Sequence, residues 1–444
     1  MSPRSLREAL AQRVLSLAGR GQLEALVHEE SLALTRFTHN AIHQNLAEHD
    51  VNVRVRALVD GRTGVAATND LSDASLAATI ARARAIAALA PPDPALPGLA
   101  FNDEPAAPPG AYSEATASAS PADRAGIAAA TIAAAERAGL WAAGYVTTAS
   151  TGLTIANTAG TLVSFDGTTC GLNVKANGPD ASGFAERHGN DVAALDGTAL
   201  GTLAAQKALA GARPASVAPG AWTVILEPAA FGELISHLTD HFSAQTVDEG
   251  SSFLADGLER AYMGPNVTIA DDFAHPLLAG CPFDFEGYPT RRLPLVAAGV
   301  AKHVVTDAAW AKRLNLANTG HGLPAPSSDG PQARHVVVSG GTKTTEQLIA
   351  ETAHGLLITR LWYIRSVDRR KTIVTGMTRD GTFEIRDGQL TRAVKNLRFN
   401  QSILASLAAP EFSHDQHRTT SYDYQIVVPT AKLPAFHFTS TTDF

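Results

Sequence analysis

The stretch from Trp222 to Leu258 reads WTVILEPAAFGELISHLTDHFSAQTVDEGSSFLADGL, and it sets the organisation of the chain. Its apolar start, Trp222 to Leu226, predicts a buried strand. Pro228 then suits the first turn of a helix, which we expect over 229–243. Apolar residues recur at helical spacing along that segment and predict the buried face of the helix. These residues are Phe231, Leu234, Ile235, Leu238 and Phe242.

Two histidines on this predicted helix raise the question of a metal site. His237 and His241 are four residues apart and project together from the flank of the apolar face. In the zincin pattern His-Glu-x-x-His, the glutamate acts as general base beside two ligands, but Leu238 takes that position here. Asp240 lies about 100° from His241 on an ideal helix and is expected to point away from the pair. Residue types alone therefore favour two polar histidines on a half-exposed helix over a metal site.

Composition bounds the class of protein. With 444 residues, 45% hydrophobic and 18% charged, the chain predicts a globular protein of about two or three domains. A net charge of -7 argues against nucleic acid and anionic membranes as partners. No apolar run approaches the roughly 18 residues of a membrane helix, and the N-terminus lacks the features of a secretory signal, so we expect a cytoplasmic protein. Cys170 and Cys281 are expected to be buried free thiols.

The order of predicted elements favours an α+β fold with mainly antiparallel sheets. We place an N-terminal domain at 1–215, with a Pro-rich surface loop at 91–120, and a more strand-rich C-terminal domain at 216–444. Helices are expected at 3–18, 72–90, 122–138 and 192–209. Three strands are expected within 140–176. Turns are predicted at Asp60-Gly61, Thr151-Gly152, Asp166-Gly167, Ala298-Gly299, Asp380-Gly381 and Asp387-Gly388.

Two further motifs favour structural roles. The segment 336–344 imitates a phosphate-binding loop but lacks its first glycine and its Gly-Lys pair, so a glycine turn with Thr342 as helix cap is the better interpretation. The pair His414 and His417 is expected in a solvated polar loop.

Several stretches together resemble the TldD/PmbA family, and most of all its TldE (PmbA) subunit. The resemblance covers nearly the whole chain and rests on the order and spacing of the stretches. They are RFTHNAIHQN (36–45), VNVRVRALVDGRTGVAATND (51–70), SGFAERHGNDVAALD (182–196), SSFLADGL (251–258), FDFEGYPTRRLPLVAAGV (283–300), SGGTKTTEQLI (339–349), HGLLITRL (354–361) and VTGMTRDGTFEIRDGQLTRAVKNLRF (374–399).

The resemblance implies where a zinc site would stand. The active subunit of such a pair resembles a zinc peptidase with His-Glu-x-x-x-His on the helix after the first C-terminal-domain strand, and with a further cysteine ligand near its C-terminus. On this chain, Ser236 takes the first histidine position, His237 the glutamate position and His241 the second histidine position. The segment SYDYQIVVP (421–429) has no cysteine. The likeness therefore implies a TldE-like chain that keeps the frame and lacks the zinc site.

The expected function is that of a TldE-like subunit of a TldD/TldE-type metallopeptidase acting in proteolysis or peptide processing. The resemblance implies a TldD-like partner that holds the zinc and a peptide or unfolded segment as substrate. The helix at 229–243 and loops near Glu286, Gly340 and Gly341 are expected to line the peptide cleft. Two alternatives remain open: an independently active metallohydrolase with metal at His237 and His241, and a homodimeric binding or scaffold protein without enzymatic activity.

Overall fold

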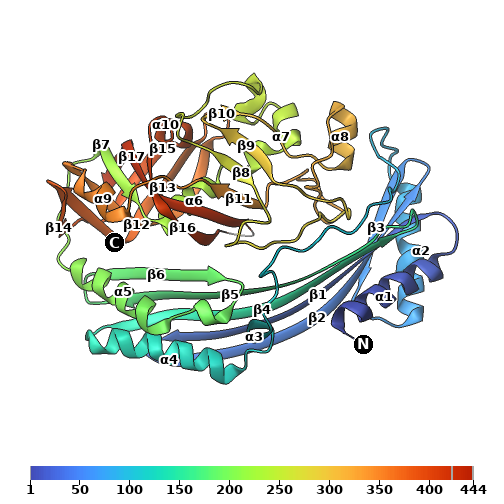
Figure 1. Cartoon of the computed structure of the whole chain (residues 1–444), viewed down its shortest axis with the longest axis horizontal. Coiled ribbons are helices and arrows are strands. Elements are labelled where there is room, and N and C mark those ends of the chain that lie inside the picture. The colour runs from blue at the N-terminus through green and yellow to red at the C-terminus, as the bar shows by residue number, and fades with distance from the viewer. Residues whose placement is uncertain (1, 422–423, 443–444) are drawn as a thin grey trace.

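The computed structural model describes residues 2–421 and 424–442, and in it helices pack on two sheets that face each other (Figure 1). The first sheet is fully antiparallel and has the strand order β3-β2-β1-β4-β5-β6. Its strands are β1 (Gln22–Thr38), β2 (Ala41–Val59), β3 (Arg62–Thr68), β4 (Trp141–Asn157), β5 (Leu162–Asn177) and β6 (Ser182–Gly189). The four central strands are long and curve across the molecule, as Figure 1 shows.

One face of this sheet is covered by helices and the other packs against the second half of the chain. The alternation of side chains along β1 shows which residues lie on each face. Side chains at successive strand positions point to opposite faces. Ala25 and Val27 pack in a core with the first two helices, whereas Leu26 between them packs with Ala279 and Phe283 of the other half. The helices of this half are α1 (Pro3–Ala18), α2 (Asp73–Leu89), α3 (Glu114–Ala117), α4 (Pro121–Arg137) and α5 (Gly197–Ala210), with a 3-10 turn η1 (Val192–Ala194).

The second sheet has eleven strands and mixes strand directions. Its path is β10-β9-β8-β11-β17-β15-β13-β12-β7, with β14 beside β13 and β16 beside β17. Strand β7 also pairs with β17, so β7, β12, β13, β15 and β17 close into a ring. Two pairs are parallel, β11 with β17 and β12 with β7. The other pairs are antiparallel, so the predicted α+β fold with mainly antiparallel sheets is confirmed.

The elements of the second half are mostly short apart from four long strands. The strands are β7 (Gly220–Leu226), β8 (Ile269–Asp271), β9 (Leu293–Ala297), β10 (Val300–Ala301), β11 (His335–Val338), β12 (His354–Asp368), β13 (Ile373–Arg386), β14 (Gln389–Ala393), β15 (Leu397–Ser402), β16 (Glu411–Ser421) and β17 (Tyr424–Thr441). The helices are α6 (Pro228–Ser236), α7 (Ala244–Asp248), α8 (Ala308–Leu314), α9 (Thr345–Ala350) and α10 (Ile403–Ser406), with 3-10 turns η2 (Thr239–Phe242) and η3 (Phe253–Asp256).

The three strands predicted within 140–176 are wrong. The chain forms only β4 and β5 there, and Gly152 pairs with Asp166 in the middle of both. A Cβ atom on Gly152 would overlap the guanidinium of Arg7, which reaches across to pair with Glu29 and Asp166. Gly152 thus makes room for a buried arginine, and the predicted turns at Thr151-Gly152 and Asp166-Gly167 do not exist.

The predicted turn at Asp380-Gly381 is also wrong. Both residues lie inside β13, with φ of 57° and 133°, where the register with β12 shifts between Ile358 and Arg360. They form an irregularity of the kind that bends a strand and redirects a side chain. The turns at Asp60-Gly61, Ala298-Gly299 and Asp387-Gly388 are confirmed, with positive φ at all six residues.

Two smaller details of the helices also differ from prediction. The helix expected from about Val192 begins at Gly197, because Asp196 caps it after the separate turn η1. Thr344, and not Thr342, caps the helix that follows the glycine turn, in a capping box with Gln347.

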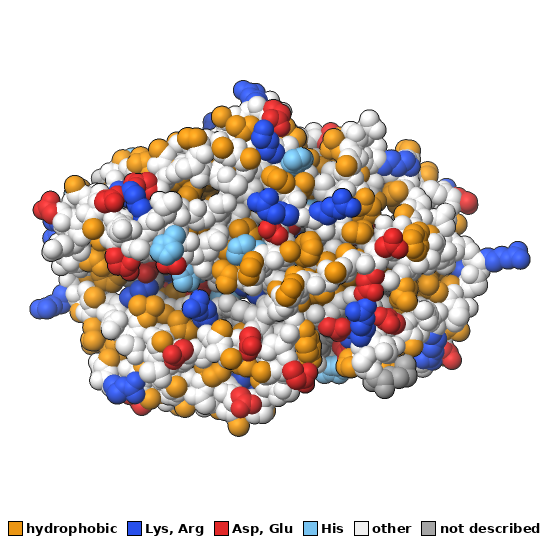
Figure 2. All heavy atoms as spheres, viewed as in Figure 1, with side chains coloured by type: hydrophobic (Ala, Val, Ile, Leu, Met, Phe, Trp, Pro, Cys, Tyr) orange, Lys and Arg blue, Asp and Glu red, His pale blue; other side chains and the backbone are white. Residues whose placement is uncertain are grey.

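No helix among the described residues is long and apolar enough to cross a membrane. Acidic and basic side chains are interspersed over the face seen in Figure 2.

Candidate functional site

The unit of β7 and α6 carries the residues at which the sequence predicted chemistry. Strand β7 ends at Leu226, Glu227 is the N-cap, and Pro228 is the first residue of α6. The apolar side chains predicted for the helix face are at most 1% exposed. They are Phe231, Leu234, Ile235, Leu238 and Phe242. Their packing against the second sheet holds the backbone that carries His237 and His241 in place.

The single helix predicted over 229–243 is wrong, because α6 ends at Ser236. The Ser236 hydroxyl donates to the Glu233 carbonyl at 2.8 Å, and the Thr239 hydroxyl donates to the Ser236 carbonyl at 2.7 Å. Such hydroxyl bonds compete with the i to i+4 ladder of an α-helix. The amides of Leu238 and His241 instead bind carbonyls three residues earlier. The chain therefore continues as the 3-10 turn η2.

This change of helix type brings four side chains to one cavity. Ser236, His237, Asp240 and His241 line a space of about 260 Å³. Asp240 thus lines the same cavity as the two histidines, and its negative charge acts to raise the pKa of each of them, against the larger effect of burial.

The opposite wall of the cavity comes from β12, β13 and their connection. Arg365 and Ser366 belong to β12, Arg369 and Thr372 follow it, and Val374 is the second residue of β13. This wall lies more than 120 residues further along the chain, so only the tertiary fold brings the two arginines near the histidines.

Burial keeps both imidazoles neutral at neutral pH. It lowers the pKa of His241 to about 4, helped by the positive charge of Arg369, and it lowers the pKa of His237 as well. Nε2 of His237 and Nδ1 of His241 are buried and find no hydrogen-bond partner among the described residues. The cavity therefore holds two uncharged, unsatisfied ring nitrogens.

These residues do not fit a zinc ion. A structural or catalytic zinc site takes three or four nitrogen, sulfur or carboxylate ligands. Within residues 2–421 and 424–442, no group of three or more His, Cys, Asp or Glu side chains is arranged to hold a metal. Ser236 uses its proton on the Glu233 carbonyl, and Arg365 and Arg369 add positive charge that opposes a second cation.

Three residues predicted to line a peptide cleft make their contacts outside the cavity of His237 and His241. They are Glu286, Gly340 and Gly341. Glu286 pairs with Arg56 of the first sheet at 3.1 Å and accepts a hydrogen bond from the Ala308 amide. Gly340 and Gly341 pack so closely on the backbone of β16 that a Cβ on either would meet it.

The second pair of histidines also differs from expectation. His414 and His417 lie in strand β16 and not in a loop. His414 is 3.0 Å from Asp415, and burial lowers the pKa of His417. In the segment 421–429, Tyr422 and Asp423 lie outside the described residues.

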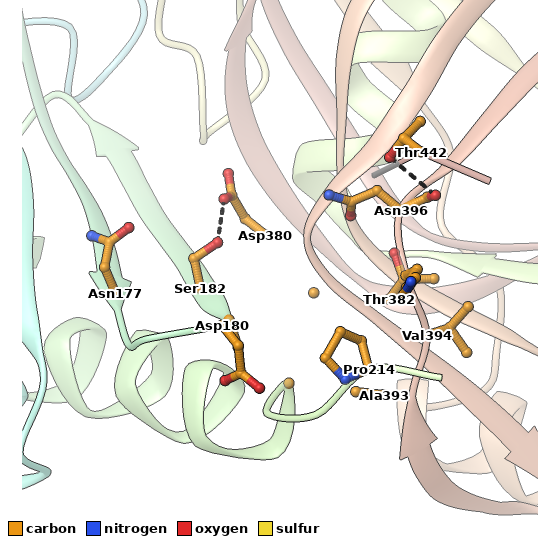
Figure 3. Close-up of a pocket in the computed structure, with 14 residues that line it drawn as sticks. Asn177, Asp180, Ser182, Pro214, Asp380, Thr382, Ala393, Val394, Asn396 and Thr442 are labelled. Carbon is orange, nitrogen blue, oxygen red and sulfur yellow. Dashed lines mark hydrogen bonds between the residues drawn. The ribbon is translucent and has the colours of Figure 1, made fainter. Parts of the chain in front are cut away.

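Sequence reasoning missed a polar contact between the two halves. Asp380, at the irregularity of β13, is 3% exposed and lies 2.9 Å from Lys175 of β5. It also accepts a hydrogen bond from Ser182 of β6 at 2.8 Å, which Figure 3 shows, and pairs with Arg360 at 3.2 Å. A cavity of about 310 Å³ lies beside this contact. The Asp-Gly dipeptide is the available signal in the sequence, but on its own it predicts a turn.

Family models match most of this architecture. The model described as PmbA/TldA metallopeptidase C-terminal domain covers residues 219–440, and the one described as PmbA/TldA metallopeptidase domain 1 covers residues 23–87. The chain belongs to the TldD/PmbA family. The first match begins just before β7 and runs to Ser440 near the end of β17, so it contains the cavity of His237 and His241 and also Asp380, but not Lys175 and Ser182, with which Asp380 pairs.

Individual members of the family are distant in sequence. Metalloprotease PmbA of Escherichia coli O157:H7 is 28% identical over 130 residues, which cover 29% of this chain and 27% of that protein. The aligned part thus spans about a quarter of this curated relative.

Solved structures match over almost the full length. TldE from Thermococcus kodakarensis has a TM-score of 0.87 at 21% identity and covers 98% of this chain and 99% of its own. A candidate modulator of DNA gyrase from Thermotoga maritima also has a TM-score of 0.87, at 19% identity, covering 97% and 100%. At such identities these likenesses establish the shared fold. The predicted resemblance to the TldD/PmbA family, most of all to TldE, is confirmed.

Proposed function

We propose that this chain is the TldE-like, non-catalytic subunit of a TldD/TldE-type metallopeptidase that processes peptides in the cytoplasm. The observation that carries the proposal is the cavity at the end of α6. The family match includes the chain around this cavity, and the resemblance implies that Ser236 and His237 take the positions of the first zinc ligand and the general base. His241 alone keeps its expected position. The zinc and the attacking water would then belong to a TldD-like partner.

The chemistry of the three positions supports this division of labour. A neutral hydroxyl that donates to a carbonyl is a poor zinc ligand, and the neutral imidazole of His237 does not supply the negative charge of the glutamate that the resemblance implies at this position. The contribution we assign to this chain is to present a stable surface to the partner and to help enclose the peptide.

The test is metal analysis after co-expression. The chain would be produced alone and together with a TldD-like protein that carries an intact His-Glu-x-x-x-His sequence. We expect the pair to co-purify with one zinc ion and to cleave peptides, and we expect the isolated chain to hold no stoichiometric zinc. Replacing the partner's motif histidines should remove both zinc and activity, while His241→Ala in this chain should leave the zinc in place.

The unsatisfied nitrogens of His237 and His241 favour one alternative, an independently active metallohydrolase. It requires the isolated chain to bind metal and His237→Ala and His241→Ala each to abolish that binding. Zinc and peptide cleavage by the chain alone would overturn the proposed role. Isolation from cells as a homodimer without a TldD-like chain would instead favour a binding or scaffold protein.

A further inference from the structure

A further cavity, which shares no lining residue with that of His237 and His241, lies where the two halves meet. It has a volume of about 430 Å³ and is lined from the first sheet by Arg36 of β1, Tyr145 of β4 and His188 of β6. Arg418 and Thr420 of β16 line it from the other half. Strand β16 faces the first sheet across this junction in Figure 1 and contacts β6.

Arg418 is the unusual member of this lining. Its side chain is only 5% exposed, and Nη1 donates to the Asn190 amide oxygen. Among the described residues, the buried Nε finds no hydrogen-bond partner and no carboxylate pairs with the guanidinium. Burial lowers the pKa of Arg418 to about 10, which still leaves it charged at neutral pH. A buried charge without a counter-charge is costly to the fold.

The surroundings of Arg418 are cationic. An adjoining cavity of about 200 Å³ shares Thr169 and Gln425 with the first and adds Arg334, whose guanidinium lies 4.7 Å from the Phe285 ring centre. Among the described residues, those that line the two cavities include three arginines and no aspartate or glutamate, in a chain of net charge -7. His188 lies 3.3 Å from Glu186, so its imidazole is already engaged.

We propose that this junction cavity binds an oxyanion, the carboxylate or phosphate group of a ligand held between the two halves, with Arg418 as its principal contact. A guanidinium offers N–H groups in a fork that matches the two oxygens of such a group. The hydroxyls of Tyr145 and Thr420 supply further donors at the same cavity. The volume falls within the range of small-ligand sites, roughly 300–1,000 Å³.

The source of the oxyanion that suits the cavity is the C-terminal carboxylate of a peptide. This choice of ligand rests on the proposed function, whereas the oxyanion site itself does not. Binding would be measured on the isolated full-length chain, without any partner subunit. A failure to pair with a TldD-like protein would therefore leave the site intact, and a failure to bind anions would leave the pairing intact.

The experiment is calorimetric titration with three probes. They are acetyl-trialanine with a free carboxylate, the same peptide as its C-terminal amide, and inorganic phosphate. We expect the free acid to bind at least about tenfold more tightly than the amide, because hydrogen bonds to a charged group are the strong ones. Arg418→Met should abolish that difference. Arg137→Met, at the exposed end of α4, is the matched control and should leave it unchanged.

A second measurement separates binding from a structural role. In the absence of ligand, Arg418→Met should melt at or above the temperature of the wild-type chain, because it removes a buried charge for which the described residues supply no counter-charge. A lower melting temperature combined with unchanged acid binding would overturn the proposal. Arg36→Gln alters only an exposed side chain, so it tests the site even if Arg418→Met does not fold, and it should weaken acid binding severalfold.

The probes also identify the source of the anion. Arg418-dependent binding of phosphate in preference to the peptide acid would support the oxyanion site and assign it to a phosphate-bearing ligand. Equal affinity for the acid and the amide, with no binding of phosphate, would overturn the site altogether.

Discussion

His241 makes a definite prediction about pH at the scale of a single residue. Its pKa is lowered to about 4 by burial, against about 6.5 in an unfolded chain. Between these values the unfolded chain binds a proton that the folded chain does not, so stability falls as the pH drops through this window and is full above it. From pH 7 to pH 5 the loss from this one group is about 2 kcal/mol.

The measurement is urea unfolding at pH 7 and pH 5 for the wild-type chain and His241→Gln. The wild type should lose up to about 2 kcal/mol more than the variant. Other shifted groups are common to both chains and cancel in the comparison. They include His335, whose pKa is lowered to about 4, and Asp284, whose pKa is raised to about 7. Asp284 changes the stability in the opposite direction, because the folded chain binds its proton more tightly than the unfolded chain does. Parallel losses would show that His241 is protonated in the folded state.

The two cysteines give a second prediction at this scale. Both are free thiols, as predicted, with Cys170 buried and Cys281 half-buried. Burial raises the pKa of Cys170 to about 11 and that of Cys281 to about 12, and the thiolate is the reactive form. We expect neither to be alkylated by iodoacetamide at pH 7.5 in the native protein and both to be alkylated in denaturant, as counted by mass spectrometry. Native labelling at either site would contradict this.

At the scale of elements, helix α5 depends on a glycine in the strand beneath it. A Cβ on Gly183 of β6 would overlap the backbone of α5 at Ala204 and Ala208. Gly183→Ala must therefore push the helix off the sheet, and we expect a loss of about 1–3 kcal/mol. Gly126 provides the matched control, since it lies in α4 with open space around the position of a Cβ.

Gly126→Ala should raise stability by about 0.5–1 kcal/mol, because alanine costs less conformational entropy in a helix. Urea unfolding of both variants checks the pair. The same substitution is expected to act with opposite sign at the two sites, and a common sign would show that backbone entropy, and not contact with α5, decides the outcome.

The sequence predicts helices and turns correctly where neighbouring residues determine them. The Asp60-Gly61 turn follows from two adjacent residues that tolerate positive φ, and α6 follows from a proline and an apolar stripe. Gly152 and Asp380-Gly381 were mistaken for turns because their partners, Arg7 and Lys175, lie more than 100 residues away. No local pattern distinguishes a glycine that turns the chain from one that makes room for a distant side chain.

The same limit applied to the candidate site. Sequence predicted that Ser236, His237 and His241 belong together, and the structure places them on one cavity. It could not predict the end of α6 at Ser236, since that depends on two hydroxyl bonds, or the wall of Arg365 and Arg369. Arg418 gave no signal at all, because an isolated arginine in a strand is ordinary until its burial is known.

For the whole molecule, polar contacts join the halves at several points. Arg56 of the first sheet pairs with both Glu24 and Glu286 at 2.8 and 3.1 Å. Asn190 donates to the Leu278 carbonyl at 3.0 Å. An apolar cluster that includes Phe165 of the first half and Phe283 of the second also joins the two halves. Such contacts couple the unfolding of two sheets that have separate cores.

Asp380 allows that coupling to be tested. In Asp380→Asn, Lys175 and Arg360 lose the buried carboxylate they share, which should cost about 3–5 kcal/mol. Because the lost contacts join the halves, the variant should also stop unfolding as one unit. Trp141 lies in the first half and Trp222, Trp310 and Trp362 in the second, so fluorescence reports mainly the second half, whereas far-UV circular dichroism reports both.

In urea the two signals should coincide for the wild-type chain and separate for Asp380→Asn, since coincident transitions mark all-or-none unfolding. Glu259→Gln is the matched control: it makes the same change from carboxylate to amide in a largely exposed pair with Lys302. Such a pair contributes about 0–1 kcal/mol, so the two signals should stay together in this variant. If they also stay together in Asp380→Asn, with an unchanged midpoint, the apolar cluster alone couples the halves, and Asp380 does not hold them together.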